Sequence, residues 1–341
     1  MKYLSLALLS GLVACSPTSK TGGSSEAVPN RIAFSNNYAG NSWRQAMLKS
    51  YETVAKKAVA DGVVAAADDF TTPDRTVPSQ AAQIQNLILQ GYNAIIINAG
   101  SPTALNGAVR KACDAGIKVV SFDGLVTEPC AYRVAVDYRA LGSAQVAQLA
   151  KLHPDGGAVL EIRGVPGTSI DDFLHAGVVE GLKAHPNLKV VSSVEGDWDQ
   201  TTTQKAVATI LPSLPVIAGV LDQGGGGYGA AQAFTAANRP LPTIILGNRQ
   251  DELAWWKEQK SKSGYRTWSA SIPPGISTLA FWVAEQLLTG RKDIPHDLVV
   301  PYLAFTQDNF EAALANVPAG GVANRDYNRT EAIAAIRSDA K

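Results

Sequence analysis

The stretch Gln83-Ile-Gln-Asn-Leu-Ile-Leu-Gln-Gly-Tyr-Asn-Ala-Ile-Ile-Ile97 joins a helical pattern to a short apolar run across a single glycine turn. Its first part predicts a helix over residues 79–90, because apolar residues recur at helical spacing. Its second part predicts a strand over residues 94–97, which is apolar without alternation. A strand of this kind is buried on both faces, as in a parallel sheet covered by helices on each side.

The same alternation of helix and strand continues on either side of this stretch. Strands are predicted at 32–34, 94–97, 119–122, 158–162, 190–194, 216–221 and 243–246. Helices are predicted at 43–60, 79–90, 103–115, 141–152, 171–185 and 201–211. Such alternation predicts an α/β fold with parallel sheets. The length of 341 residues favours two doubly wound lobes, each with a sheet of about five or six strands.

Polar and aromatic residues follow most of the predicted strands. Ligands of such folds bind at the carboxyl ends of the strands, so these residues are the candidate site. They are Asn37, Tyr38, Trp43, Asn98, Asp123, Asp137, Arg163, Thr168, Trp198, Gln223, Asn248 and Arg249. Planar polar groups bind vicinal hydroxyls and aromatic rings cover C–H faces, which together favour a polyhydroxylated ligand. For any one of them the alternative is a turn or helix-cap residue.

The amino terminus predicts export. Lys2, a short apolar run and the sequence Leu12-Val-Ala-Cys15 form a secretory signal over 1–14, too short for a membrane-spanning helix. The placement of Cys15 resembles a bacterial lipobox, which would lipidate that cysteine. Residues 15–29 then form a Ser-, Thr- and Gly-rich tether to a membrane. The alternative is an ordinary secretory signal that contains a cysteine.

The balance of charges bears on which kinds of partner the protein binds. The chain has 30 basic and 30 acidic residues, so nothing favours nucleic acid as a binding partner.

The remaining cysteines and histidines indicate a disulfide and no catalytic site. With Cys15 lipidated, Cys113 and Cys130 remain as a pair, and an oxidising compartment favours a disulfide between them over two buried thiols. The four histidines, His153, His175, His185 and His296, have no spacing typical of a metal site or a catalytic triad. We therefore predict no enzyme activity, no metal and no cofactor.

The segment Ala115-Gly-Ile-Lys-Val-Val-Ser-Phe-Asp123 and four further segments follow one another in a distinctive order: Ile32–Tyr38, Gln83–Ile97, Arg163–Thr168 and Gly196–Asp199. In this order they resemble the substrate-binding proteins of sugar ABC importers, of the ribose-binding type, and the segment ending at Asp123 resembles a typical pattern of that family. The resemblance covers roughly residues 31–309. It implies two lobes joined by three crossovers near residues 136–137, 271–272 and 300–301, closing over a ligand. The first lobe would be 30–136 plus 272–300, and the second 137–271 plus a tail, 301–341.

The resemblance also implies roles. Asn37 and Trp43 would form a wall of the first lobe, and Asn98 and Asp123 would bind hydroxyls. The second lobe would contribute Arg163 or the loop Thr168–Asp172, with Trp198, Gln223, and Asn248 or Arg249. The expected protein is a monomer that delivers a sugar to an ABC permease and contacts the membrane only through its lipid.

The sequence departs from the family at three places. Gln223-Gly224 stands where Asn-Asp is usual, Arg249 lies near a usual Asp, and Ile272-Pro-Pro274 replaces Gln-Asp-Pro. Exchanging an acid for an arginine weakens the case for a neutral ribose-like sugar and opens that for an acidic or partly apolar ligand. The tail after Asn309 is longer than usual and has no assigned role.

Other functions stay open at this point. A sensor subunit that docks to a chemoreceptor or kinase would have the same sequence features. The run Gly224-Gly-Gly-Gly-Tyr-Gly229 satisfies the G-x-G-x-x-G fingerprint, with Arg249 twenty residues later, so an NADP-dependent oxidoreductase is a further alternative. That fingerprint normally lies in the first βα turn of its domain, whereas this run lies deep in the chain.

Overall fold

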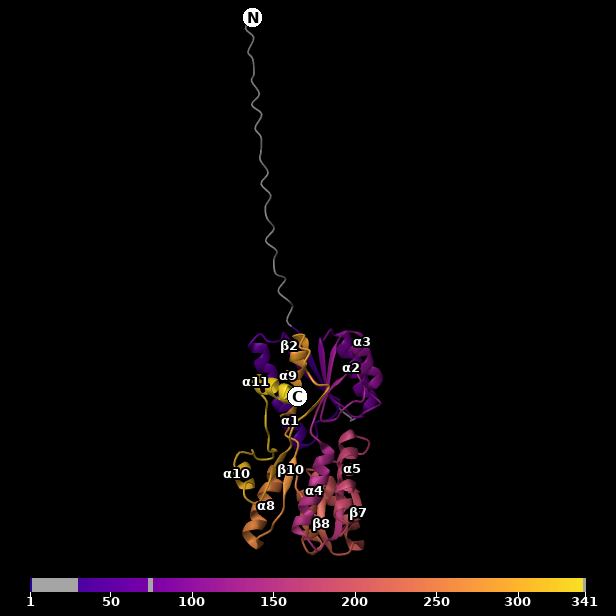
Figure 1. The fold of residues 1–341 in the computed structure, drawn as a ribbon, viewed down its shortest axis with the longest axis vertical. Coiled ribbons are helices and arrows are strands. Elements are labelled where there is room, and N and C mark those ends of the chain that lie inside the picture. The colour runs from indigo at the N-terminus through magenta and orange to yellow at the C-terminus, as the bar shows by residue number, and fades with distance from the viewer. Residues whose placement is uncertain (2–29, 73–75, 340–341) are drawn as a thin grey trace.

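The computed structural model describes Met1 and residues 30–72 and 76–339. The predicted signal sequence, Cys15 and the tether lie outside the described residues. The rest forms two α/β lobes, one above the other in Figure 1, with the sheet of each enclosed between helices.

The first lobe is built on a six-stranded sheet. Its order is β11-β5-β4-β3-β1-β2, and all neighbouring strands are parallel. These strands are β1 (Arg31–Asn36), β2 (Ala66–Thr71), β3 (Ala94–Asn98), β4 (Lys118–Phe122), β5 (Tyr132–Ala135) and β11 (Asp297–Val299). Helices α1 (Ser42–Ala60) and α9 (Ile276–Leu288) pack on one face, and α2 (Val77–Leu89) and α3 (Asn106–Asp114) on the other. Successive apolar side chains along β1 and β3 point to opposite faces of the sheet and pack against the helices on both sides, as the sequence predicts.

The second lobe has a four-stranded parallel sheet in the order β7-β6-β8-β9. Its strands are β6 (Gly157–Arg163), β7 (Leu188–Glu195), β8 (Ile217–Asp222) and β9 (Thr243–Ile244). Helices α4 (Tyr138–Leu152) and α5 (Ser169–Ala184) cover one face; α6 (Gln200–Ile210), the 3₁₀ turn η1 (Leu211–Ser213), α7 (Gly227–Ala236) and α8 (Gln250–Ser263) lie on the other side. The sheet is smaller than the five or six strands expected, since β9 ends at Ile244 and β10 (Ser269–Ser271) joins this edge only through a single parallel bridge between Leu246 and Ser269.

The chain passes between the lobes after β5, between β10 (Ser269–Ser271) and α9, and between β11 and β12 (Leu303–Phe305). Strands β10 and β12 pair with each other in an antiparallel ribbon. This ribbon carries the second and third connections side by side, so both approach the first lobe from one place.

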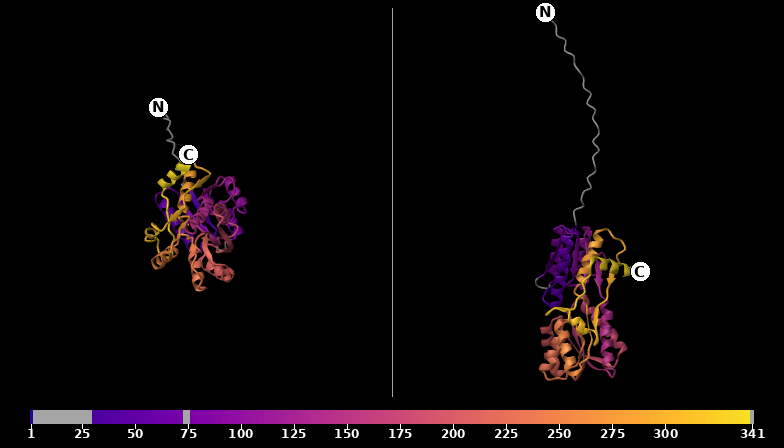
Figure 2. Two further views of the ribbon diagram at one scale, coloured as in Figure 1. Left: turned by 60° about the horizontal axis from the view of Figure 1, so that its bottom comes forward. Right: turned by 90° about the vertical axis from the view of Figure 1, so that its left-hand side faces the viewer.

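The carboxyl-terminal tail corrects the predicted lobe boundaries. Only its first part, with α10 (Phe310–Leu314), packs on the second lobe. Its last helix, α11 (Arg329–Asp339), lies on the first lobe, where Ala332 and Ile336 are fully buried with residues of α9 (Figures 1 and 2). The expected placement of all of 301–341 with the second lobe was therefore wrong, because a long-range apolar contact decides it and no local pattern reports such a contact.

Candidate ligand site between the lobes

A pocket lies where the carboxyl ends of the two sheets face each other. Both lobes and the connection between them contribute its walls. The lining residues are Asn41, Trp43, Arg44, Asp123, Ile170, Trp198, Gln223, Gly224, Gly225, Gly247, Arg249, Ser271 and Ile272. A molecule in this pocket would contact both lobes at once.

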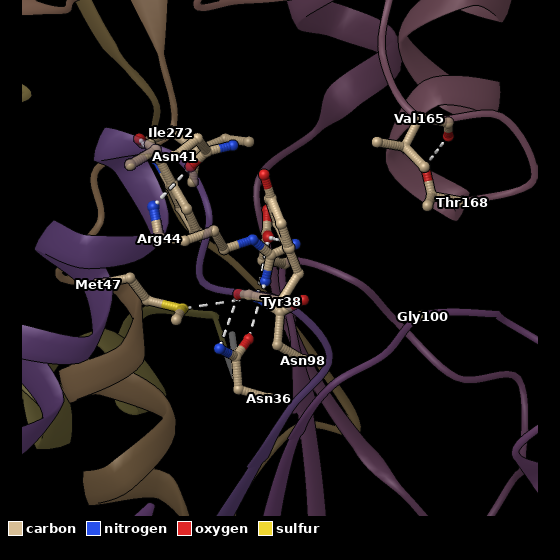
Figure 3. A network of polar contacts seen from close by, with 12 residues as sticks. Asn36, Tyr38, Asn41, Arg44, Met47, Asn98, Gly100, Val165, Thr168 and Ile272 are labelled. Carbon is tan, nitrogen blue, oxygen red and sulfur yellow. Dashed lines mark hydrogen bonds and ion pairs between the residues drawn. The ribbon is translucent and has the colours of Figure 1, made fainter. Parts of the chain in front are cut away.

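Asp123 lies at the end of β4 on the first-lobe side and is only 3% exposed. Its Oδ2 is 3.5 Å from a guanidinium nitrogen of Arg44 and accepts a hydrogen bond of 3.0 Å from Asn98 Nδ2. Its Oδ1 accepts one of 3.1 Å from the hydroxyl of Tyr138. Figure 3 shows Arg44 and Asn98 close together in this network, with Asn36 and Met47 beside them. The carboxylate is thus held in one orientation at the pocket wall.

The electrostatics of Asp123 favour a hydrogen-bond donor in the pocket. Burial raises the pKa of this carboxyl above its usual value, and Arg44, Asn98 and Tyr138 offset only part of that rise. Its backbone has a φ of 56°, which is rare for a residue with a side chain. Strain and incomplete compensation of a buried charge concentrate at binding sites. A ligand hydroxyl that donates to Asp123 would relieve the missing solvation.

Arg249 faces the pocket from the second lobe and is 8% exposed. Its guanidinium donates to the carbonyl oxygens of Gly225, at 3.2 Å, and Trp198, at 2.7 Å. A Cβ atom on Gly225 would lie 2.2 Å from the Arg249 Cζ, so only glycine allows the guanidinium to lie against this loop. Arg249 therefore joins the glycine-rich loop to the segment that presents the Trp198 indole.

Two buried carboxylates hold the backbone beneath Arg249. Glu252 accepts hydrogen bonds from the backbone N–H groups of Gly227, Gly247 and Arg249, at 2.9–3.2 Å. Asp222 accepts one of 3.1 Å from Gly226. Burial raises the pKa of both carboxyls, and the charge of Asp222 raises that of Glu252 further.

These contacts argue against the alternative that the run from Gly224 to Gly229 binds a dinucleotide. In a G-x-G-x-x-G site the pyrophosphate binds the N–H groups at the helix amino terminus. Here carboxylate oxygens of Asp222 and Glu252 accept from Gly226 and Gly227, where α7 begins. A pyrophosphate there would meet two acidic side chains instead of free donors. The glycines serve close packing against Arg249 and the neighbouring loop.

Two indoles flank the pocket from opposite lobes. Trp43 lies in the first turn of α1, and its Nε1 donates a hydrogen bond of 2.8 Å to the carbonyl of Ile272 in the second connection. Trp198 precedes α6 and has a φ of 53°. Both side chains are partly exposed at the pocket; the Arg44 guanidinium lies over the Trp43 ring, and the Trp198 ring packs against Gly164. Rings in this arrangement suit the C–H faces of a sugar.

The structure brings five of the predicted residues into the lining of the pocket: Trp43, Asp123, Trp198, Gln223 and Arg249. Others lie directly behind them. Asn98 supports Asp123. Arg163 forms an ion pair with Asp171. The backbone N–H of Gly164 donates to both Asp171 Oδ1 and Gln223 Oε1. Asn248 donates to the carbonyl of Leu303 in the ribbon.

The remaining predicted residues lie outside the lining. Asp137 caps α4 by accepting from Ala140 N–H at 2.8 Å, which also starts that helix at Tyr138, earlier than predicted. Thr168 caps α5, and the Asp172 side chain is 62% exposed. Asn37 and Tyr38 follow β1 without lining the pocket; Tyr38 lies beside the Arg44 network in Figure 3. For Asp137 and Thr168 the helix-cap alternative describes what the structure shows.

Sequence reasoning missed Arg44, Ser271 and Ile272 as lining residues, whereas Ile170 belongs to the predicted loop Thr168–Asp172. Arg44 follows Trp43 in α1, and its position beside a predicted wall residue was the one available signal. Among the described residues, no group of His, Cys, Asp and Glu side chains is placed to hold a metal ion. No helix in the described part of the chain is long and apolar enough to cross a membrane.

Two lobes enclosing a pocket at their strand ends define a bilobal solute-binding protein. Residues 32–292 match the family described as periplasmic binding protein domain, and the chain belongs to that family. A solute-binding protein of an ABC transporter from Thermobispora bispora has a similar structure, with a TM-score of 0.85 and 32% identity, covering 91% of this chain and 95% of that one.

Curated relatives agree with this assignment. The ribose import binding protein of Bacillus subtilis is 26% identical over 263 residues, which cover 76% of this chain and 82% of the relative. A xylitol-binding protein of Mycolicibacterium smegmatis is 27% identical over 254 residues, covering 73% of this chain and 71% of the relative. The predicted resemblance to ribose-binding-type proteins and the predicted α/β fold are confirmed. The family is one of extracytoplasmic binding proteins, so the expectation of a binding protein instead of an enzyme is also confirmed.

Proposed function

We propose that this protein captures a neutral sugar or polyol outside the cytoplasm and delivers it to an ABC importer. One observation carries the proposal: Asp123 and Arg44 of the first lobe face Trp198 and Arg249 of the second lobe across one pocket. A small polyhydroxylated molecule there can bind polar groups and aromatic faces from both lobes. The names of the ribose and xylitol relatives support this ligand class.

The charges at the pocket favour a neutral ligand over an acidic one. Arg44 is paired with Asp123. Arg249 donates to two backbone carbonyls, and the Asp222 and Glu252 carboxyls lie beneath it. The arginine that distinguishes this sequence from the usual family pattern thus has protein partners. An acidic ligand would have to compete with those partners, whereas hydroxyl groups can add to them.

Binding is expected to proceed by closure of the lobes. Asp123 accepts hydrogen bonds from ligand hydroxyls, Arg44 and Arg249 donate to them, and the two indoles cover the C–H faces. Because these groups come from both lobes, a ligand stabilises the closed arrangement more than the open one. The permease would then distinguish the closed, loaded protein from the open one.

A thermal-shift screen tests this function. The protein is produced from residue 15 onward with Cys15→Ser and freed of co-purified ligand by unfolding and refolding. Pentoses, hexoses, polyols, sugar acids, amino acids, NAD and NADP form the panel. A ligand at 100 times its Kd stabilises the folded state by about 2.7 kcal/mol. We expect a rise of at least several degrees for one class of neutral sugar or polyol. A rise with sugar acids or NADP alone would contradict the proposal.

We also propose that the protein is a monomer held at a membrane by a lipid on Cys15, with Cys113 and Cys130 oxidised to a disulfide. The positions of Cys113 in α3 and Cys130 in the loop before β5, with Cα atoms 6.4 Å apart, support this disulfide. Intact-mass spectrometry of the protein purified from membranes checks the covalent state. We expect a chain that begins at Cys15, carries acyl groups and has two hydrogens fewer than the reduced form. An unmodified chain would refute the anchor, and alkylation of Cys113 and Cys130 without reduction would refute the disulfide.

A further inference from the structure

The carboxyl-terminal segment, residues 310–339, makes a further passage between the lobes. It starts on the second lobe, where the Phe310 ring stacks on Trp256 with centroids 3.8 Å apart and an interplanar angle of 12°. Beside this stack, Lys260 donates a hydrogen bond of 2.8 Å to Glu311. Phe310 is fully buried, so this end of the segment is an integral part of the second lobe's core.

The middle of the segment pairs with the backbone that presents Arg249 to the pocket. Gln250 N–H donates to the carbonyl of Gly321, and Ala323 N–H donates to the carbonyl of Asn248, both at 3.0 Å. Val322 forms an antiparallel bridge with Arg249. Val322 is buried, and so is Ala323. The pocket wall at Arg249 is therefore supported from behind by the carboxyl-terminal segment.

The next residues anchor the segment on the first lobe. Asn324 accepts a hydrogen bond of 2.6 Å from Gly275 N–H and donates one of 3.0 Å to Ser50. Further contacts join Tyr327 to Thr278 and Trp282. Arg329 makes a bidentate ion pair with Glu285, whose side chain is only 5% exposed.

The two sets of contacts are adjacent in the chain, since Ala323 binds the second lobe and Asn324 the first. No spare residue separates them. The segment also lies against the second connection: a Cβ atom on Gly275 would be 2.2 Å from the carbonyl oxygen of Arg325. Separation of the lobes must therefore strain the passage from Ala323 to Asn324 or break one set of contacts.

We propose that residues 321–329 act as a fourth interlobe connection, which positions Arg249 and limits how far the lobes separate. This inference rests on the proposed function for its effect on sugar affinity, but the limit on opening is independent of any ligand. If the lobes open less in the free protein, closing them around a ligand has a smaller unfavourable free-energy cost. An intact connection therefore strengthens binding. Coupling between such elements and a binding site is typically about 5- to 150-fold.

The test detaches the segment from the first lobe with the double substitution Asn324→Ala and Arg329→Ala. Spin labels on Ala104→Cys and Pro166→Cys report the opening, because these exposed residues follow β3 and β6 on opposite sides of the cleft. Cys15→Ser removes the remaining unpaired cysteine. Without ligand, we expect longer distances between the labels, and with the sugar from the thermal-shift screen an affinity about 5- to 10-fold weaker.

Arg110→Ala is the matched control. Arg110 and Glu128 form a bidentate pair in the same lobe, with a Glu side chain that is 7% exposed and an exposed Arg, away from the segment. A second variant, Gly275→Ala, displaces the segment without removing an ion pair and is expected to lengthen the distances too. Label distances equal to those of the control in both variants would overturn the proposal, as would longer distances with unchanged sugar affinity. Absence of sugar binding in the parent protein would count against the proposed function alone.

Discussion

Asp123→Ala is expected to lower sugar affinity at least about 100-fold, which converts to about 2.7 kcal/mol. The carboxylate is almost fully buried at the pocket wall, where Arg44, Asn98 and Tyr138 fix its direction. A hydrogen bond to a charged group contributes about 1.5–3 kcal/mol, and a carboxylate can accept two from vicinal hydroxyls. Calorimetric titration with the sugar found in the screen measures the loss.

Asp293→Ala serves as the control for this prediction. Asp293 also pairs with an arginine, Arg291, but is exposed and lies after α9, away from the pocket. The Asp293→Ala variant is expected to bind the sugar with the same affinity as the parent protein. Circular dichroism must show that both variants remain folded. If Asp123→Ala binds the sugar as tightly as Asp293→Ala does, Asp123 has no place in the site.

The same carboxyl predicts a pH dependence within that titration series. Burial raises the Asp123 pKa above its usual value, and binding uses the ionised form. Affinity should therefore be full at neutral pH and fall on acidification, starting at a higher pH than an ordinary aspartate would give. The Asp123→Asn variant should lack this fall, since its side chain does not titrate.

Arg249→Ala is expected to weaken binding about 50-fold, or about 2.3 kcal/mol. The guanidinium donates to Gly225 and Trp198, so its loss releases the glycine-rich loop and the indole together. It also leaves the Asp222 and Glu252 carboxyls without the nearby positive charge. Arg249→Lys should restore little, because one ammonium cannot reproduce two diverging N–H donors in a planar fork.

Arg239→Ala is a matched control in the same lobe. Arg239 likewise donates to backbone carbonyls, those of Leu211, Leu214 and Pro215. These contacts lie in the second lobe but outside the pocket lining. Its loss should lower the melting temperature without changing sugar affinity. Equal losses of affinity in Arg239→Ala and Arg249→Ala would mean that Arg249 acts only through general stability of the lobe.

Local sequence patterns could predict the sheets and part of the site. The apolar runs at 94–97 and 119–122 are strands because both faces are covered, and Asp123 follows the second of these runs directly. Trp198 and Arg249 were found for the same reason. Asp137 and Thr168 are also polar residues that follow strands, but their side chains cap helices instead. An oxygen that can bind a hydroxyl can also bind a backbone N–H, so residue type alone does not separate the two uses.

Long-range contacts could not be predicted in this way. Arg44 reaches Asp123 from the first turns of a helix that begins 81 residues earlier in the chain, and nothing in its neighbours reports that ion pair. The carboxyl-terminal segment is the larger case. Asn324 meets Ser50, 274 residues away, and the position of α11 follows from apolar burial against α9. Such contacts depend on how the finished lobes fit together.

Calorimetric titration of the ligand-free protein with neutral pentoses, hexoses and polyols tests the central claim most directly. The account predicts saturable binding of one ligand class at one site per chain. It also predicts that the heat disappears with Asp123→Ala and is strongly reduced with Arg249→Ala, one substitution from each wall of the pocket. Binding that survives both substitutions, or a protein that binds none of these compounds, would contradict a sugar site between the lobes.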